Sequence, residues 1–249
     1  MINYIFADII RISRKKSFLS TLGVYILLFL LMIFIYENPS FNGDAFIAKT
    51  DTFLGFFPLI IGLTTFLSIY YDDFKSKSMQ VAIGYGMSRN KVVLSKFFET
   101  IIISVLSALC VGIVVLLMSF ILDKSLTDLQ YTELGLTIVA EILRTIGYIS
   151  ISTVFVYFTQ NAVMGTVIFV LLSSKTVLIF ASMVLGQSII VNVFGNLSKY
   201  LYTVLLYTEK SLYIQTGHFT FNALMGILIY VILPTIIAIF SFRKKELEF

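Results

Sequence analysis

The chain has 249 residues, of which 58% are hydrophobic and 13% charged, and its formal net charge is +4. The charged share is about half of that in ordinary soluble domains, which excludes a typical soluble protein and indicates a membrane protein. The basic residues flank apolar runs instead of gathering on one soluble face, so we predict no nucleic-acid partner. The single cysteine, Cys110, excludes an intrachain disulfide.

Residues 2–16 mix isoleucines and Phe6 with Asp8 and four basic side chains. This pattern predicts an amphipathic helix lying in the membrane interface. A signal peptide is the alternative interpretation. We reject it because the apolar run over residues 18–36 exceeds the roughly 7–15 residues of a signal-peptide core, and no small-residue cleavage site follows it.

Six apolar segments are long enough to cross a bilayer, which requires roughly 20 residues. The predicted spans cover residues 18–36, 52–71, 97–122, 135–158, 163–185 and 223–242. Pro58 lies inside the second span, where neighbouring helices would have to satisfy the carbonyl that proline leaves free. The chain is therefore predicted to be an all-α membrane protein with one transmembrane domain over residues 1–249.

The connections between the spans differ in character. Residues 37–51 and 123–133 are polar and are predicted to form loops on one side of the membrane, whereas 159–162 is a tight turn on the other. Residues 186–222 are too polar for a further plain span and too apolar for a free loop. Within this segment, we expect one or two short helices over residues 189–207, lying in or dipping into the outer interface.

The basic residues decide the predicted orientation. Twelve of the eighteen share one side: Arg11, Arg14, Lys15, Lys16, Lys75, Lys77, Arg89, Lys91, Lys96, Arg243, Lys244 and Lys245. By the positive-inside rule that side is cytoplasmic, so both termini are predicted to be cytoplasmic. No internal repeat is visible, so nothing in the sequence supports a secondary carrier built from inverted repeats.

Residues 71–96 form the longest polar interruption between two predicted spans. Each of their charged side chains would cost about 2.5–3.5 kcal/mol at the bilayer centre, so the stretch stays outside the hydrocarbon. Apolar side chains, including Phe74 and Met79, recur at near-helical spacing and predict a short amphipathic helix. Gly84 and Gly86 would end this helix, and Ser88 would cap the next one.

This stretch also carries a recognisable order of residue types. An acidic residue leaves a span, a small residue follows, and Gly-x-Ser-Arg and a lysine open the next span. The order resembles the small six-span permease subunits of type-2 ABC exporters. The matching residues are Asp73, Ser78, Gly86, Ser88, Arg89 and Lys96. The span arrangement extends the resemblance to the whole chain, although Lys77-Ser78 stands where the family often has Gly-Thr.

The resemblance implies that the stretch containing Phe74 is a coupling helix seated on a separate ATPase subunit. Two permeases, identical or related, would then assemble with two ATPases in a bacterial cytoplasmic membrane. ATP and Mg would bind to the ATPases, so this chain is expected to need no cofactor and to catalyse no reaction. The resemblance is closest to permeases that export peptides, including those conferring bacteriocin immunity, so an amphipathic or antimicrobial peptide is the expected substrate.

Other substrates and other classes of function stay open at this point. A drug, a lipid or an ion could replace the peptide. A membrane sensor or scaffold that transports nothing, and a membrane-embedded enzyme, are hypotheses of different classes. No stretch has the P-loop spacing, because Gly84–Lys91 lacks it, and no Ser-His-Asp arrangement is recognisable. His218 is the only histidine, which excludes a multi-histidine metal site.

Charged and hydroxyl side chains also fall inside the predicted spans. Glu141 and Arg144 lie three residues apart in the fourth span, on one helix face. The residues near the middle of the fifth span are Ser173, Ser174, Lys175 and Thr176. Intramembrane charges of this kind line transport paths. They are equally compatible with a structural ion pair involving Glu141, in which Lys175 extends its stem toward the outer surface.

Overall fold

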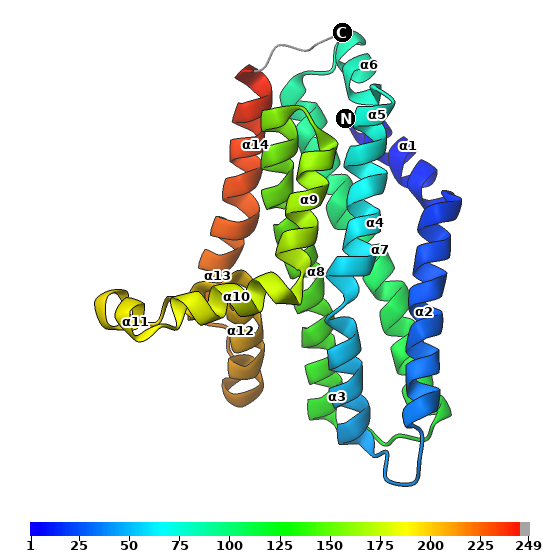
Figure 1. Ribbon diagram of the computed structural model, residues 1–249. Coiled ribbons are helices and arrows are strands. Elements are labelled where there is room, and N and C mark those ends of the chain that lie inside the picture. The colour runs from blue at the N-terminus through cyan, green and yellow to red at the C-terminus, as the bar shows by residue number, and fades with distance from the viewer. Residues whose placement is uncertain (245–249) are drawn as a thin grey trace.

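The computed structural model describes residues 1–244, and within them the chain forms helices joined by short turns (Figure 1). Lys245, one of the twelve basic residues above, lies outside the described residues. The helices are α1 (Ile2–Ser13), α2 (Lys16–Tyr36), α3 (Gly43–Leu54), η1 (Pro58–Gly62), α4 (Leu63–Phe66), η2 (Leu67–Tyr71), α5 (Asp72–Lys75), α6 (Ser78–Gly84), α7 (Arg89–Ile121), α8 (Asp128–Thr159), α9 (Ala162–Ser173), α10 (Lys175–Leu185), α11 (Ser188–Phe194), η3 (Leu197–Tyr200), α12 (Tyr202–Thr216), α13 (Phe221–Ile227), η4 (Leu228–Ile232) and α14 (Leu233–Lys244).

Five helical stretches are long and apolar enough to cross a membrane, which agrees with the predicted all-α membrane class. They are Lys16–Tyr36, Gly43–Lys75, Arg89–Ile121, Asp128–Thr159 and Phe221–Lys244. The predicted fifth span, 163–185, is divided into α9 and α10, which meet at an angle of 64°. The described helices thus give five continuous candidate spans and one bent pair.

Two predicted loops are shorter than expected because helices begin inside them. Helix α3 starts at Gly43, within the predicted loop 37–51, and the side chain of Asn42 accepts a hydrogen bond from the Ala45 amide. Helix α8 starts at Asp128, where Thr127 and Gln130 form a reciprocal capping box. These caps satisfy amides that have no intrahelical partner, so helix formation begins before the apolar run does.

The stretch Gly43–Lys75 is helical but irregular. Helix α3 ends at Leu54 with Gly55 at its C-cap, and π-helical turns η1 and η2 interrupt the helix that follows. Pro58 is the first residue of η1 and has no amide to donate. Carbonyl groups near this break must therefore find donors elsewhere.

Helix α8 occupies the centre of the bundle and packs against α3, α7, α9, α12 and α14. Its approach to α9 depends on Gly165, where a Cβ atom would lie 2.1 Å from Val156 Cγ2. Side chains as large as Tyr157, Phe66 and Phe169 are completely buried around these helices. Helix α8 is thus the central element against which these five helices are positioned.

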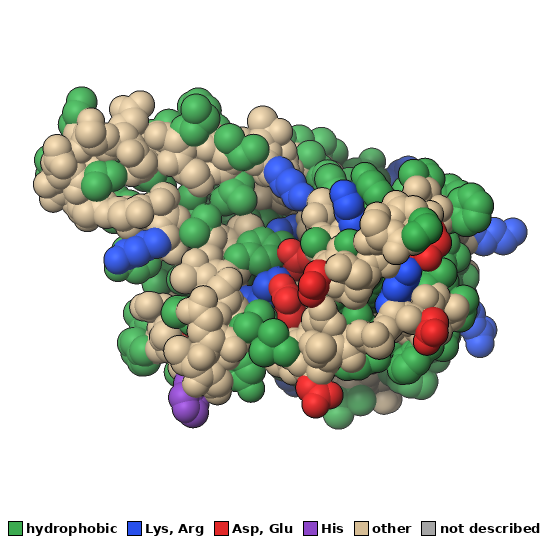
Figure 2. Space-filling view, turned by 90° about the horizontal axis from the view of Figure 1, so that it is seen from below, with side chains coloured by type: hydrophobic (Ala, Val, Ile, Leu, Met, Phe, Trp, Pro, Cys, Tyr) green, Lys and Arg blue, Asp and Glu red, His purple; other side chains and the backbone are tan. Residues whose placement is uncertain are grey.

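The two ends of the bundle differ in charge, and Figure 2, which views the loop end, shows acidic side chains gathered there beside basic ones. The basic end contains α1, α5, α6, the turn at 159–162 and the end of α14, and the loop end contains the connections at 37–42 and 122–127 (Figure 1). Between the two ends, α10 and α11 leave the bundle sideways, and we call Lys175–Phe194 the arm. Helices α12 and α13 form a hairpin that brings the chain back to α8.

Candidate functional site

Within the polar stretch 71–96, whose residues 74–89 were predicted to couple to a partner, residues 72–88 form a compact segment at the basic end. Helix α5 continues the second span, and Lys77 turns the chain with a φ of 56°. Helix α6 ends at Gly84, as predicted, and Gly86 adopts a φ of 91°, a conformation that favours glycine. Ser88 occupies the N-cap of α7 as predicted, but its side chain makes no capping hydrogen bond. We call residues 72–88 the coupling segment.

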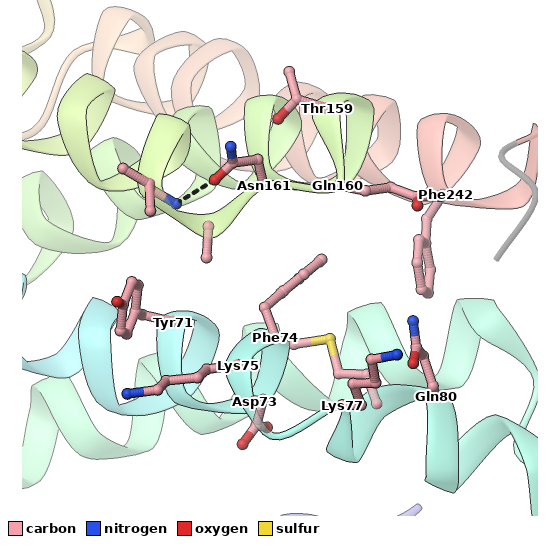
Figure 3. A pocket seen from close by; sticks show the side chains of 13 residues that line it. Tyr71, Asp73, Phe74, Lys75, Lys77, Gln80, Thr159, Gln160, Asn161 and Phe242 are labelled. Carbon is pink, nitrogen blue, oxygen red and sulfur yellow. Dashed lines mark hydrogen bonds between the residues drawn. The ribbon is translucent and has the colours of Figure 1, made fainter. Parts of the chain in front are cut away.

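A groove of about 750 Å³ opens beside the coupling segment (Figure 3). Helices α5 and α6 form one wall, and residues 159–163 with Phe242 form the other. In Figure 3 the Phe74 ring points into the groove, whereas the Asp73 carboxylate points away from it. Amine and amide side chains, among them Lys77 and Gln160, give the groove a polar lining.

The outer edge of the coupling segment is exposed. Tyr85, at the end of α6, is 90% exposed, and Val81, one turn earlier, is 55% exposed. Lys75 and Lys77 are exposed on the same segment. Tyrosine is one of the residues enriched in protein-binding hot spots.

The inner side of the coupling segment is held by a buried ionic cluster, which we call the basic-end cluster. Lys96 Nζ lies 2.9 Å from Glu99 Oε2 and also pairs with Asp8 and Asp73. Arg11 pairs with Asp8 at 3.0 Å and with Asp73 at 2.8 Å. The side chains of Lys96 and Glu99 are fully buried, and that of Asp73 is 1% exposed. The cluster joins the segment to α1 and α7.

Tyr4 closes the basic-end cluster on the side of α1. The Lys96 ammonium lies 4.6 Å from the centre of its ring. Burial raises the pKa of the Tyr4 hydroxyl to about 12, although the Lys96 charge acts in the opposite direction. The phenol therefore stays neutral and offers Lys96 the face of its ring.

The remaining predicted coupling residues have internal roles. Arg89 Nη1 donates to the carbonyls of Phe242 and Arg243, at 3.1 and 3.2 Å, and so satisfies the last turn of α14. The Phe74 ring packs on Tyr157 at 6.0 Å between centroids. The Ser78 hydroxyl is buried and has no hydrogen-bond partner among the described residues. Of the predicted set, Gly86 and Ser88 are exposed.

A second buried cluster, the mid-bundle cluster, is centred on Arg144. Its guanidinium lies 3.0 Å from Glu141 Oε2, donates to the Gly55 carbonyl at 2.5 Å, and donates to the Tyr207 hydroxyl at 3.1 Å. Tyr207 in turn donates to Glu141. Arg144 is only 4% exposed and Glu141 2%. Arg144 thus supplies a hydrogen-bond donor to the helix break before Pro58. The sequence predicted that a neighbouring helix would supply such a donor.

The polar residues of the predicted fifth span form a helix break rather than an ion pair. The Ser173 hydroxyl donates to the Phe169 carbonyl at 2.8 Å, and Ser174 is the N-cap of α10, accepting from the Thr176 amide. Lys175 is exposed, with its Nζ 4.3 Å from the centre of the Phe56 ring. Among the described residues, the ionic partner of Glu141 is Arg144 and not Lys175.

Several members of these clusters were not identified from the sequence. They are Asp8, Arg11, Glu99 and Tyr207. A third group near the loop end was also not identified; in it, Lys210 pairs with Asp51 at 2.7 Å and with Glu133 at 3.6 Å. The spacing of three residues, between Asp8 and Arg11 and between Lys96 and Glu99, is the signal that could have found the basic-end cluster. No pattern in the sequence marks Tyr207.

The described residues contain no group of histidine, cysteine or acidic side chains that could hold a metal ion. Comparisons of the chain with protein-family models, curated proteins and solved structures give no match. The two buried clusters and the exposed edge of the coupling segment are therefore the observations from which function is inferred.

Proposed function

We propose that this chain is the permease subunit of an ABC exporter, which moves its substrate outward with energy from a separate ATPase subunit. The observation that carries the proposal is the coupling segment. It presents an exposed edge at the basic end, with Tyr85 90% exposed. At the same time, Asp73 anchors it from inside to α1 and α7.

The basic-end cluster gives the segment a mechanical connection to the spans. Lys96 on α7 holds Asp73 of the segment and Asp8 of α1 at the same time. Separating a buried pair costs about 3–5 kcal/mol because it leaves a charge without a partner. A displacement of the segment would therefore be passed to α1 and α7 instead of being absorbed by a loose loop.

The proposal assigns the basic end to the cytoplasm by the positive-inside rule. Both termini are then cytoplasmic. The ATPase would contact Tyr85 and Val81, and one of its polar segments would enter the groove lined by Lys77 and Gln160. ATP and Mg would bind to the ATPase, and two permeases would assemble with two ATPases.

An amphipathic peptide is the proposed substrate. A groove of about 440 Å³ lies between α8, α12 and α13, within the roughly 300–1,000 Å³ of small-molecule sites. Apolar side chains such as Val139 and Leu224 form most of its wall, and Glu209 and Lys210 lie at its lining. An apolar surface with charged groups beside it suits a molecule that is itself partly apolar and partly charged.

The test is to purify the tagged chain from its native membrane and to identify what co-purifies. A protein with a P-loop motif is expected with the wild type and with Phe34→Ala, a control that removes an aromatic ring 80% exposed on α2. Tyr85→Ala should weaken the association about 30-fold, the equivalent of a hot-spot loss of roughly 2 kcal/mol. Absence of such a partner from the wild-type preparation would instead favour a sensor or scaffold.

A further inference from the structure

The groove beside the coupling segment has two ends, which we call its membrane side and its tip side (Figure 3). Tyr71, Lys75 and Asn161 lie toward the membrane side, and Lys77 and Gln160 lie toward the tip side. Tyr71 is the last residue of η2 and ends the apolar run of the predicted second span, so its end of the groove is the one nearer the membrane. The ATPase segment proposed above would enter at the tip side, which is separate from the membrane side.

The charges that line this groove are positive. Lys75 and Lys77 are both exposed, and neither has an ionic partner among the described residues. Asp73 is the acidic member of the described lining, but its carboxylate points away from the groove and pairs with Lys96 and Arg11. Lys75 extends its amine toward the membrane side. This side of the groove therefore presents a cation, and no carboxylate of the described lining faces it.

The opposite wall adds hydrogen-bond donors. Helix α9 begins there at Ala162, and the amides of its first turn have no intrahelical acceptor. The side-chain oxygen of Asn161 accepts from one of them, the Val163 amide, at 2.9 Å. The other amides and the positive end of the helix dipole favour a negatively charged group. A phosphate at the membrane side would thus meet an ammonium on one wall and helix amides on the other.

An exposed apolar strip continues from the membrane side of the groove along α9. Val163, which lines the groove, is 54% exposed, Val167 is 48% exposed and Val170 is 36% exposed. Their spacing of four and three residues places them on one helix face, over a length of about 10 Å. The groove lies where the apolar runs end, and the strip leads from it into the apolar layer. A charged headgroup followed by an acyl chain has the same order of chemistry.

We propose that the membrane side of the groove binds the headgroup of an anionic phospholipid, whose acyl chain lies along the apolar strip on α9. Basic pockets between transmembrane helices on the cytoplasmic side bind anionic headgroups in this way. The lysine favours an anionic lipid over a neutral one, and the strip favours a lipid over a free phosphate. The bound headgroup would join α5 to α9 across the groove. This inference goes beyond the proposed function, because it requires only that the spans cross a membrane and does not require the ATPase.

The test measures lipid binding to the purified full-length chain by native mass spectrometry. The probes are dioleoyl phosphatidylglycerol and dioleoyl phosphatidylcholine, which share their acyl chains and differ in headgroup charge. We expect the wild type to retain phosphatidylglycerol several-fold more tightly than phosphatidylcholine. Lys75→Gln should weaken phosphatidylglycerol binding about five-fold, the effect of one lysine beside an anionic lipid. Lys91→Gln is the matched control and should leave the affinity unchanged, because Lys91 is exposed at the same end of the bundle and does not line the groove.

A second pair of variants tests the position of the acyl chain. Val167→Ser should weaken the binding of both lipids, whereas Ile113→Ser, which replaces a side chain 57% exposed on α7, should not. Equal binding by these two variants would refute the placement of the acyl chain on α9.

Three outcomes would overturn the headgroup site. The first is equal phosphatidylglycerol binding by Lys75→Gln and Lys91→Gln. The second is phosphatidylcholine bound by the wild type as tightly as phosphatidylglycerol, because the headgroup charge would then not be recognised. The third is displacement of phosphatidylglycerol by an equimolar amount of inorganic phosphate, because the groove would then hold a free anion instead of a lipid.

Discussion

Replacing Lys96 by methionine tests whether the basic-end cluster holds the coupling segment. In the wild type, Lys96 and Arg11 face three carboxylates, those of Asp8, Asp73 and Glu99. Methionine keeps the length of the side chain and removes its charge. Arg11 alone is then left to balance three carboxylates, of which Asp73 is 1% exposed and Glu99 fully buried.

The expected loss follows from the burial of these groups. Removing one partner of a buried ion pair costs about 3–5 kcal/mol. For a chain of this size that corresponds to a fall in melting temperature of roughly 6–20 °C. The assay is thermal unfolding of the purified protein in detergent. Lys91→Met is the matched control, because Lys91 lies five residues earlier on the same helix and is exposed, and its expected change is within about 0.5 kcal/mol.

A second variant separates charge balance from packing. Lys96→Met combined with Glu99→Gln leaves one cation and two carboxylates, so the cluster has a net charge of −1, the same as two cations with three carboxylates. More than half of the lost stability should return. Equal melting temperatures for Lys96→Met and Lys91→Met would refute the assignment of Lys96 as the anchor of the segment.

Three further predictions concern packing, the mid-bundle cluster and topology. Gly165→Ala should lower the free energy of unfolding by about 1–3 kcal/mol, because the added methyl group overpacks the contact between α8 and α9. Gly23→Ala is the control, since nothing lies within 4 Å of its added Cβ. Equal unfolding temperatures for the two variants would contradict the close approach of α8 and α9. Arg144→Lys should lower thermal stability, because lysine cannot reproduce the fork of donors to Gly55 and Tyr207; an unchanged melting curve would show that a point charge is enough. In intact cells, a cysteine at Ser40 should react with an impermeant thiol reagent and one at Ser76 should not; labelling at Ser76 would reverse the proposed orientation.

The sequence predicted the elements whose signal is local. Apolar runs of membrane length marked the five continuous helices, and Gly84 marked the end of α6. The caps Asn42 and Thr127 were present in the sequence, but the polar residues around them were interpreted as loops. The bend at Ser174 was also hidden, because apolar residues continue on both sides of the break.

The buried clusters could be predicted only in part, because their members are far apart in the chain. Glu141 and Arg144 share a helix face, so their pairing was visible. Tyr207 lies 66 residues from Glu141, and no spacing rule connects the two. The predicted partner, Lys175, is displaced because its own helix begins at that residue and turns away from the bundle.

The mid-bundle cluster has a consequence for how the protein enters the membrane during synthesis. The apolar 18-residue stretch within α8 has a mean hydropathy of 1.5, the lowest among the corresponding stretches of the five continuous candidate spans. Glu141 and Arg144 both oppose its insertion into the membrane. An arginine at the centre of an inserting helix costs roughly 2.5–3.5 kcal/mol. Gly55 is made before α8 and can receive the guanidinium as α8 emerges, whereas Tyr207 is made 63 residues after Arg144. Helix α8 can therefore bind the stretch after α3 as soon as it is made. Its hydrogen bond to Tyr207 forms only once α12 has left the ribosome.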